Sequence, residues 1–398
     1  MMKNKPIYLD YNATTPCAPE VLEMMISFFG STFANPASPH MMGREAARAV
    51  EAARCQVAFA IGADTEDIIF TSGATESNNM VFSSMANRKQ IKHRIVVGAG
   101  EHKSVLEPCR LMSEMGFNVV HIPLTESGIA NIDAAKDIID DETLIVSIQG
   151  ANNETGVLQP VKTIADIARS HGALVHCDAA QMLGKMPVAI EDAGVDYASV
   201  SAHKLYGPKG IGALFVRRGR PRALIAPLLR GGGQESGLRS GTLNVPAIVG
   251  FGKACQLIIT CLGEEIEQIR RLRDLFETEL IAIIPDAFVI GAQASRLPGT
   301  SDICFIDVPA DALLARANRI CISSGSACTS GTISPSHVVL ACGYSRDMAR
   351  CVVRISLGRY TTEEDIHIAV EHLATCVKAI RDEYAFQPGH KSVASYGR

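Results

Sequence analysis

The chain has 398 residues, more than one hydrophobic core usually requires, so two domains are expected. Hydrophobic residues make up 47% and charged residues 20% of the sequence, a balance typical of globular proteins. The 38 basic and 42 acidic side chains leave a formal charge of −4, and no run rich in lysine and arginine occurs. Direct binding of nucleic acid is therefore not expected.

The apolar segments do not predict secretion or membrane insertion. Residues 1–7 carry charge but lack the apolar stretch of a signal peptide. The longest mainly apolar segment, Val245–Gly263, contains Lys253 and Gln256 and is typical of a packed helix. We therefore expect a cytoplasmic protein that does not cross a membrane.

The twelve cysteines include no C-x-x-C pair, which argues against zinc ribbons, ferredoxin-type clusters and thioredoxin-like redox sites. Disulfides are not expected in a cytosolic protein. Cys55, Cys255 and Cys351 occur in apolar helical patterns, so we expect them to be small buried hydrophobic side chains.

Residues 65–217 alternate short β-branched runs with amphipathic helical patterns. The expected buried strands are Asp67–Thr71, Arg94–Gly98, Asn118–Ile122, Leu144–Ile148, Leu174–Cys177 and Tyr197–Ser201. Val161–His171 is typical of the connecting helices, because Ile164, Ile167 and Ala168 share one face. This alternation predicts a mostly parallel sheet covered on both faces. Ile211–Val216 follows the preceding strand too closely for a helical crossover, so we expect it to be antiparallel.

The rest of the chain predicts a second, α+β unit. A helix near residues 247–261 is followed by a charged helix, Glu264–Leu280, and the chain closes with a helix from about Thr362 to Tyr384. We place the domain boundary near residue 262. The large domain is expected to span residues 16–262, and residues 1–15 and 263–398 are expected to form the small domain.

Three chemically useful groups follow predicted strands. Lys204 lies just past Tyr197–Ser201, in a loop bounded by glycine and proline. Thr71–Glu76 ends one strand and opens a helix, where backbone N–H groups and hydroxyls can bind a phosphate. Asp178 ends a third strand, where a carboxylate can hold a protonated heterocycle nitrogen. A lysine, a phosphate cradle and a carboxylate at neighbouring strand ends are what pyridoxal phosphate requires.

Other interpretations of these features stay open at this point. A single loop lysine is usually a solvated surface residue. His171, His176 and Asp178 can be imagined as a metal site, although no third ligand is defined beside His176 and Asp178. The glycines at 231–233 lack G-x-G-x-x-G spacing and no Walker A motif occurs, so nucleotide binding has little support.

Cys328 differs from the other cysteines because it lies among small polar residues, in the segment Ser323–Gly331. Such surroundings are typical of an exposed thiol, and the thiolate is the nucleophilic form of cysteine. The alternative is a surface loop that contains an incidental cysteine.

These segments belong to a longer ordered series of motifs. The series comprises Tyr8–Pro16, Asn35–His40, Thr71–Asn79, Glu101–His102, Asn152–Gly156, Asp178–Gln181, Ser201–Gly210, Arg239–Thr242, Ser323–Gly331 and Arg354–Arg359. Over nearly its whole length the sequence resembles the NifS/IscS-type cysteine desulfurases, and its Cys328 segment resembles the NifS-like members most. Ser236 departs from the pattern, since many relatives carry arginine there; the departure affects a local contact but no chemical role.

The resemblance implies an α/β fold of the pyridoxal-phosphate-dependent transferase type I, with a mostly parallel seven-stranded sheet and a smaller α+β domain. It implies that Lys204 binds pyridoxal 5′-phosphate and moves a proton between the substrate and the cofactor. Asp178 would hold the pyridinium nitrogen, and His102 would stack on the ring and act as an acid–base group. The other implied cofactor-binding residues are Ala74, Thr75, Ser201 and His203 at the phosphate, Thr242 reaching it from the second subunit, Gln181 at the phenolic oxygen, and Asn153.

The resemblance also implies the reaction. Arg354, with Asn153 and Asn35, would bind the carboxylate of L-cysteine, a role that suits the planar fork of arginine. Cys328 would take the substrate sulfur as a persulfide, leaving L-alanine. A homodimer and a sulfur-accepting scaffold protein of the NifU/IscU type are implied as partners, for iron–sulfur cluster assembly or other sulfur delivery. No resident metal is implied, although Cys328 could serve as a transient iron–sulfur ligand with the scaffold.

Three other activities compete with this interpretation. A selenocysteine lyase or a sulfinate-acting relative would share the fold and the cofactor without requiring a protein thiol. An aminotransferase of the same group would have no use for Cys328. A catalytically silent sulfur-trafficking protein would not need Lys204, Asp178, His102 and Arg354 together.

Overall fold

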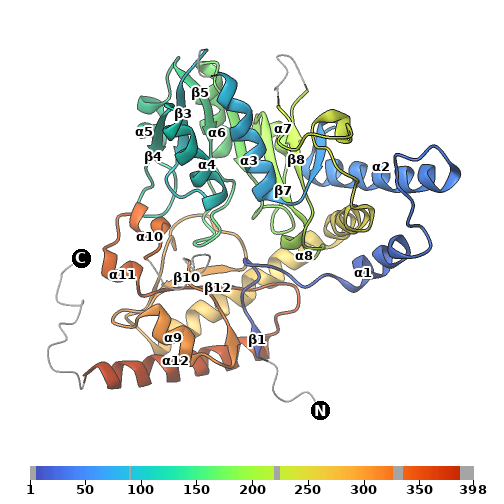
Figure 1. Cartoon of the computed structure of the whole chain (residues 1–398). Coiled ribbons are helices and arrows are strands. Elements are labelled where there is room, and N and C mark those ends of the chain that lie inside the picture. The colour runs from blue at the N-terminus through green and yellow to red at the C-terminus, as the bar shows by residue number, and fades with distance from the viewer. Residues whose placement is uncertain (1–5, 89–90, 219–224, 326–334, 386–398) are drawn as a thin grey trace.

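The computed structural model describes residues 6–88, 91–218, 225–325 and 335–385. A seven-stranded sheet of order β2-β8-β7-β6-β5-β3-β4 lies in its larger part (Figure 1). The strands are β2 (Ile68–Thr71), β3 (Arg94–Gly98), β4 (Asn118–Ile122), β5 (Thr143–Ser147), β6 (Leu174–Asp178), β7 (Tyr197–Ser201) and β8 (Gly212–Val216). β8 is antiparallel to both neighbours and the other pairs are parallel, so the predicted sheet is confirmed.

The prediction was wrong in one respect for Asn118–Ile122, which we expected to be buried. β4 is an edge strand, in which Asn118 and His121 are exposed and only Ile122 is buried. An edge strand has a neighbour on one side only, so polar side chains there can face solvent and discourage pairing with other chains.

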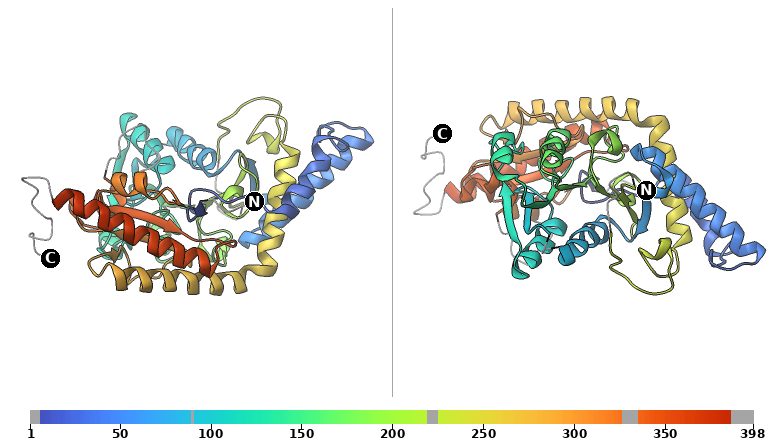
Figure 2. Two further views of the ribbon diagram at one scale, coloured as in Figure 1. Left: turned by 90° about the horizontal axis from the view of Figure 1, so that it is seen from below. Right: turned by 90° about the horizontal axis from the view of Figure 1, so that it is seen from above.

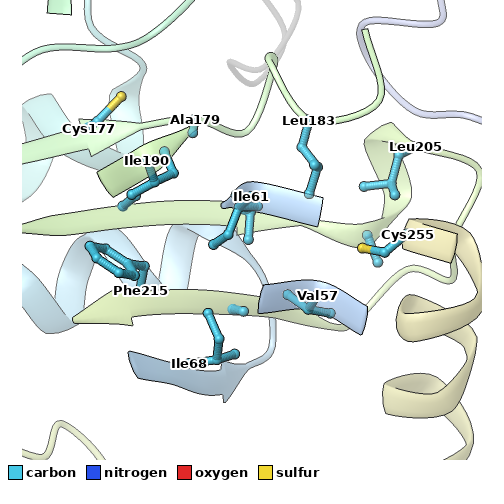
Figure 3. Packing of buried hydrophobic residues seen from close by; sticks show 14 of the residues in the cluster. Val57, Ile61, Ile68, Cys177, Ala179, Leu183, Ile190, Leu205, Phe215 and Cys255 are labelled. Carbon is cyan, nitrogen blue, oxygen red and sulfur yellow. The ribbon is translucent and has the colours of Figure 1, made fainter. Parts of the chain in front are cut away.

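Helices cover both faces of this sheet, because alternate strand residues point to opposite sides. In β3, Ile95 and Val97 pack with α3 and α4, whereas Val96 packs in the cluster that contains α2, α6 and part of α8. Figure 3 shows that second cluster, with Val57 of α2 and Cys255 of α8 near the strands. The helices of this part are α1 (Pro19–Ile26), α2 (Met41–Ile61), α3 (Ala74–Met85), α4 (Lys103–Glu114), α5 (Ile132–Ile138), α6 (Val161–Ser170), α7 (Ile190–Ala193) and α8 (Val245–Ile283).

We expected two helices that meet near residue 262, but α8 is a single helix of 39 residues. Gly263 does not end it, because one interior glycine costs only about 1 kcal/mol and both flanking parts are packed. By length and composition α8 could cross a membrane, but 56% of its most apolar window is buried inside the protein, as in the core helices of soluble proteins.

The C-terminal part has its own core. Leu272 and Phe276 of α8 pack there with Leu9 from the N-terminus, whereas Ile258 packs in the core of the large sheet. The division at residue 262 stays a prediction, which this change of packing partner supports. The remaining elements are β1 (Ile7–Tyr8) paired with β11 (Ile320–Cys321), a sheet of β9 (Phe288–Val289), β10 (Thr300–Cys304) and β12 (Val352–Ser356), and the helices α9 (Ala310–Arg316), α10 (His337–Ala341), α11 (Arg346–Ala349) and α12 (Glu363–Ala385).

Among the cysteines, Cys255 and Cys351 are buried as expected, but Cys55 is exposed. The buried stripe of α2 runs through Val50, Ala53 and Val57, and Cys55 lies off that stripe. No disulfide joins the cysteines in the described ranges.

Candidate active site

Three strands of the large sheet end in polar residues at the same edge. β2, β6 and β7 run in the same direction, and they end at Thr71, Asp178 and Ser201. The carboxyl ends of parallel strands are the usual ligand-binding edge of an α/β sheet. The structure therefore brings the residues after these three strands to one place.

Lys204 ends a short 3₁₀ turn, Ala202–Lys204, that directly follows β7. Its Nζ donates hydrogen bonds to the carbonyl oxygens of Asn12 and, at 2.8 Å, Ala13. Lys209, the other lysine of this loop, is exposed and lies 3.5 Å from the carbonyl oxygen of Thr15. Of the two amines, Lys204 is the one positioned at the strand edge.

Asp178 is almost fully buried, at 7% exposure, and both of its carboxylate oxygens accept hydrogen bonds. Oδ1 accepts from the backbone N–H of Ala180 at 3.0 Å, and Oδ2 accepts from Nδ2 of Asn78 at 2.8 Å. The same Nδ2 donates to Oγ of Ser104 at 2.8 Å. Asn78 thus links the carboxylate to the start of α4, although the sequence patterns assigned it no role.

His102 is the N-cap residue of α4, where its Nδ1 accepts from the backbone N–H of Ser104 at 3.1 Å. Burial lowers the pKa of His102, as does the positive charge of Lys204, while Asp178 opposes them. The ring is therefore neutral at neutral pH. Because its Nδ1 accepts a hydrogen bond, the proton of the neutral ring resides on Nε2.

The start of α3 can bind an anion. The helix has twelve residues and begins at Ala74, so the backbone N–H groups of Ala74 and Thr75 point out of its positive end. Ser201 faces this turn, since a β-carbon on Gly73 would lie 3.7 Å from its Oγ. A β-carbon on Gly212 would lie only 2.7 Å from Cα of Gly73, so glycine permits this close approach.

His203 lies beside the same edge, with its Nδ1 3.1 Å from Oγ1 of Thr14. Burial and then the charges of Lys204 and Lys209 lower its pKa to about 4, so it is a neutral polar partner at neutral pH. Thr242 is exposed in the segment ahead of α8. Its role at the phosphate of a second subunit stays a prediction.

Arg354 extends from β12 toward this region and is 7% exposed. Its Nη1 donates to the carbonyl oxygen of Asn153 at 3.0 Å, and its Nη2 pairs with Oδ1 of Asp10 at 2.8 Å. The structure thus brings Arg354 and Asn153 together, and it adds Asp10, which the sequence patterns did not assign. Asn35 lines a different cavity of about 520 Å³, together with Arg54, so its part in carboxylate binding stays a prediction.

Cys328 lies outside the described residues, but the chain on both sides of it is placed. On one side, Oγ of Ser323 donates to Oδ2 of Asp10 at 2.6 Å. On the other side, Oγ of Ser336 donates to Oε2 of Glu154. Both flanks are therefore attached close to Arg354 and Asn153.

His176 and His171, which were named as possible metal ligands, form hydrogen bonds with other side chains instead. His176 is fully buried and holds Ser147 at 2.8 Å and Ser199 at 3.1 Å with its two ring nitrogens. Burial lowers its pKa to about 4. His171 instead lies 2.8 Å from Asp141.

The donor set suits pyridoxal phosphate. It offers an amine for the aldehyde, a buried carboxylate for the pyridine nitrogen, and a helix start with a hydroxyl for the phosphate. A further acceptor is present, since Oδ1 of Asn78 is buried without a hydrogen-bond partner among the described residues. These groups come from β6, β7 and α3, and they match the chemistry of the cofactor group by group.

Comparison with known proteins identifies the class. The sequence profile of the family described as aminotransferase class-V matches residues 7–368. The chain belongs to this family, which is pyridoxal-phosphate-dependent. Within it, the cysteine desulfurase IscS of Rickettsia akari is 42% identical over 378 residues, covering 94% of this chain and 92% of the relative.

Solved structures agree with this assignment. A structure titled NifS-like protein has a TM-score of 0.88 and 36% identity, covering 94% of this chain and all (100%) of the other. Another, titled SspA in complex with cysteine, has a TM-score of 0.76 and 33% identity, covering 89% of this chain and 100% of the other. The resemblance to cysteine desulfurases and the expected α/β fold are confirmed.

Proposed function

We propose that this chain is a pyridoxal-phosphate-dependent cysteine desulfurase that converts L-cysteine to L-alanine and accepts the sulfur on Cys328. The observation that carries the proposal is one arrangement. Lys204, Asp178 and His102 lie at the strand edge. One flank of the Cys328 segment, Ser323, is hydrogen-bonded to the backbone of Arg354, and the other flank, Ser336, is hydrogen-bonded to Glu154. The family membership and the similarity to cysteine desulfurases support it.

The overall reaction balances without a further oxidant or reductant. The Cβ–S bond of L-cysteine breaks, and an S–S bond forms between that sulfur and Sγ of Cys328. The carbon skeleton keeps the electron pair of the broken bond and takes up a proton, which gives L-alanine. Cys328 loses its thiol proton and becomes a persulfide.

The residues of the chain divide this work. When bound, pyridoxal phosphate supplies a sink for the electrons released at the substrate Cα. Arg354 binds the substrate carboxylate, and Nζ of Lys204 takes the Cα proton and returns it. His102, which carries its proton on Nε2, can donate there and exchange a proton with the substrate. Asp178 holds a positive charge at the pyridine nitrogen, because its carboxylate is buried and oriented by Asn78.

We further propose a homodimer in the cytoplasm that passes its sulfur to a scaffold protein for iron–sulfur cluster assembly. Helices α1 and α2 project from the body of the molecule (Figure 2), and large exposed apolar side chains lie on them and on the segment between them. These include Ile26, Phe29, Phe33, Met41 and Phe59, each at least 68% exposed. A second copy of the chain would cover such a surface, which supports the dimer.

The proposal is tested by supplying the purified protein with pyridoxal phosphate, L-cysteine and a thiol reductant. L-Alanine and sulfide should form in equal amounts. Alanine formation from selenocysteine but not from cysteine would instead establish a selenocysteine lyase. A protein that binds no pyridoxal phosphate would refute both activities.

A further inference from the structure

Lys185 provides a second amine beside the candidate site. It follows β6 and Gln181 in the chain, and its Nζ donates to Oδ1 of Asn12 at 2.6 Å and to Oε1 of Gln181. It lines a small cavity with Lys204, Asn12 and Tyr206, whose volume of about 20 Å³ leaves room for one water molecule at most. Lys185 is only partly exposed, and no ion pair among the described residues holds its amine.

The electrostatic surroundings of Lys185 oppose a positive charge. Burial, followed by the charges of Lys204 and Arg354, lowers its pKa well below its usual value, while Asp10 acts in the opposite direction. Either protonation state of a lysine amine supplies at least two N–H donors. The two contacts to Asn12 and Gln181 can therefore form in both states.

The hydrogen bonds of Lys185 determine the orientation of the side-chain amides of Gln181 and Asn12. The oxygen of the Gln181 amide accepts from Lys185, so its Nε2 lies on the other side, where it donates to the carbonyl oxygen of Asn12 at 3.0 Å. The amide of Asn12 is fixed in the same way, because its Nδ2 donates to Oγ1 of Thr300 at 3.0 Å. A carbonyl oxygen can only accept, so the orientation is consistent throughout the network.

Gln181 has one further N–H to offer after its bond to Asn12. Under the proposed function, on which this inference rests, that N–H serves the phenolic oxygen of the cofactor. The carbonyl oxygen of Asn12, which receives Nε2 of Gln181, also receives Nζ of Lys204. One small network therefore contacts both groups that would meet the cofactor ring.

We propose that Lys185 is a positioning residue that holds the amide of Gln181 with its N–H₂ group directed toward the cofactor. Without the donor at 185, Oε1 of Gln181 loses its partner, and only the bond from Nε2 to the carbonyl oxygen of Asn12 still opposes rotation of the amide. The rotated amide would present its oxygen to the phenolic oxygen, so a donor contact would become a repulsion between two oxygen atoms. Loss of a hydrogen bond to a charged acceptor corresponds to a roughly ten- to hundred-fold loss of affinity.

The test uses Lys185→Met, which keeps an unbranched four-atom side chain in place of the lysine stem and removes its donors. Apo protein is titrated with pyridoxal phosphate, and the dissociation constant and the visible absorption band are recorded. We expect weaker binding by roughly ten- to hundred-fold and a band shifted to shorter wavelength, because the phenolic oxygen loses a donor. Lys209→Met is the matched control, since that amine is exposed, and it should behave as wild type.

A double-mutant cycle shows whether Lys185 acts through Gln181. Once Gln181→Met has removed the amide, adding Lys185→Met should cause no further loss of affinity or shift of the band. Additive effects would contradict the proposal, as would an unchanged band and affinity in Lys185→Met alone. If Lys185→Met is too unstable to purify, Lys185→Gln gives the same test, since its shorter polar side chain ends short of both acceptors. A wild-type protein that binds no pyridoxal phosphate would refute the proposed function, and not the orientation of Gln181.

Discussion

Replacement of Arg354 by lysine tests how the site binds its substrate. Arg354 is nearly buried, and the structure places one arm of its guanidinium on Asp10 and the other on the carbonyl oxygen of Asn153. Arg354→Lys keeps the positive charge near Asp10 but replaces the planar fork by a single ammonium group. Folding and cofactor binding should therefore persist, whereas bidentate binding of the cysteine carboxylate should not.

The loss of one charge-assisted hydrogen bond costs about 1.5–3 kcal/mol, which corresponds to a roughly ten- to hundred-fold increase in KM for L-cysteine. Steady-state alanine production measures KM, and the visible spectrum checks that the cofactor remains bound. Arg296→Lys is the matched control: Arg296 is also nearly buried and forms a two-bond pair with Glu277, at 2.8 and 3.0 Å. That variant should lose stability and keep its KM. An unchanged KM in Arg354→Lys would mean that another residue binds the carboxylate.

Three further predictions concern the cofactor site and stability. Borohydride reduction of the loaded protein should fix the cofactor on Lys204, and a peptide map that finds it on Lys209 would refute the assignment. Gly212→Ala should lower the affinity for pyridoxal phosphate, measured by titration, because its β-carbon would meet the carbonyl oxygen of Val200 at 2.4 Å and displace Gly73; wild-type affinity would show that the two strand ends can separate freely. Asp302→Asn should stabilise the protein, and the gain should increase from about pH 4 to pH 8. Burial and then the charge of Glu154 raise the pKa of Asp302 to about 8, although Arg354 acts in the opposite direction. The folded state therefore keeps a proton that the unfolded state has lost, so the stability of the wild type falls as the pH rises through this range. Thermal unfolding of both proteins at pH 5 and pH 8 measures how much more stable the variant is. An equal gain in stability at both pH values would contradict the protonation of Asp302 as the cause.

Local patterns were sufficient to predict the sheet and the residues at its edge. β-Branched runs and turn residues are signals within a few positions, and each of the expected strands between residues 65 and 217 is present. Asp178 could be found because it ends such a strand, and Lys204 because it lies three residues past the end of another. The sequence did not reveal that α8 is continuous, because its stability depends on packing with two separate cores.

The residues that sequence reasoning left unassigned act through contacts distant in the chain. Asn78 reaches Asp178 across 100 positions, and Lys185 reaches Asn12 across 173. Asp10 pairs with Arg354 from the opposite end of the sequence. Asn78 and Asp10 lie within the recognised motifs, which was the available signal. Lys185 lies beyond the motif that ends at Gln181, and no spacing rule pointed to it.

The central claim is that Cys328 receives the sulfur of L-cysteine. Mass spectrometry of the loaded protein after a single turnover, without reductant, measures this directly. We expect the peptide that contains Cys328 to gain the mass of one sulfur atom, and Cys328→Ser to gain none and to lose alanine production from cysteine while it retains its cofactor spectrum. An unmodified Cys328 peptide in the wild type, or near-normal alanine production by Cys328→Ser, would contradict the desulfurase mechanism.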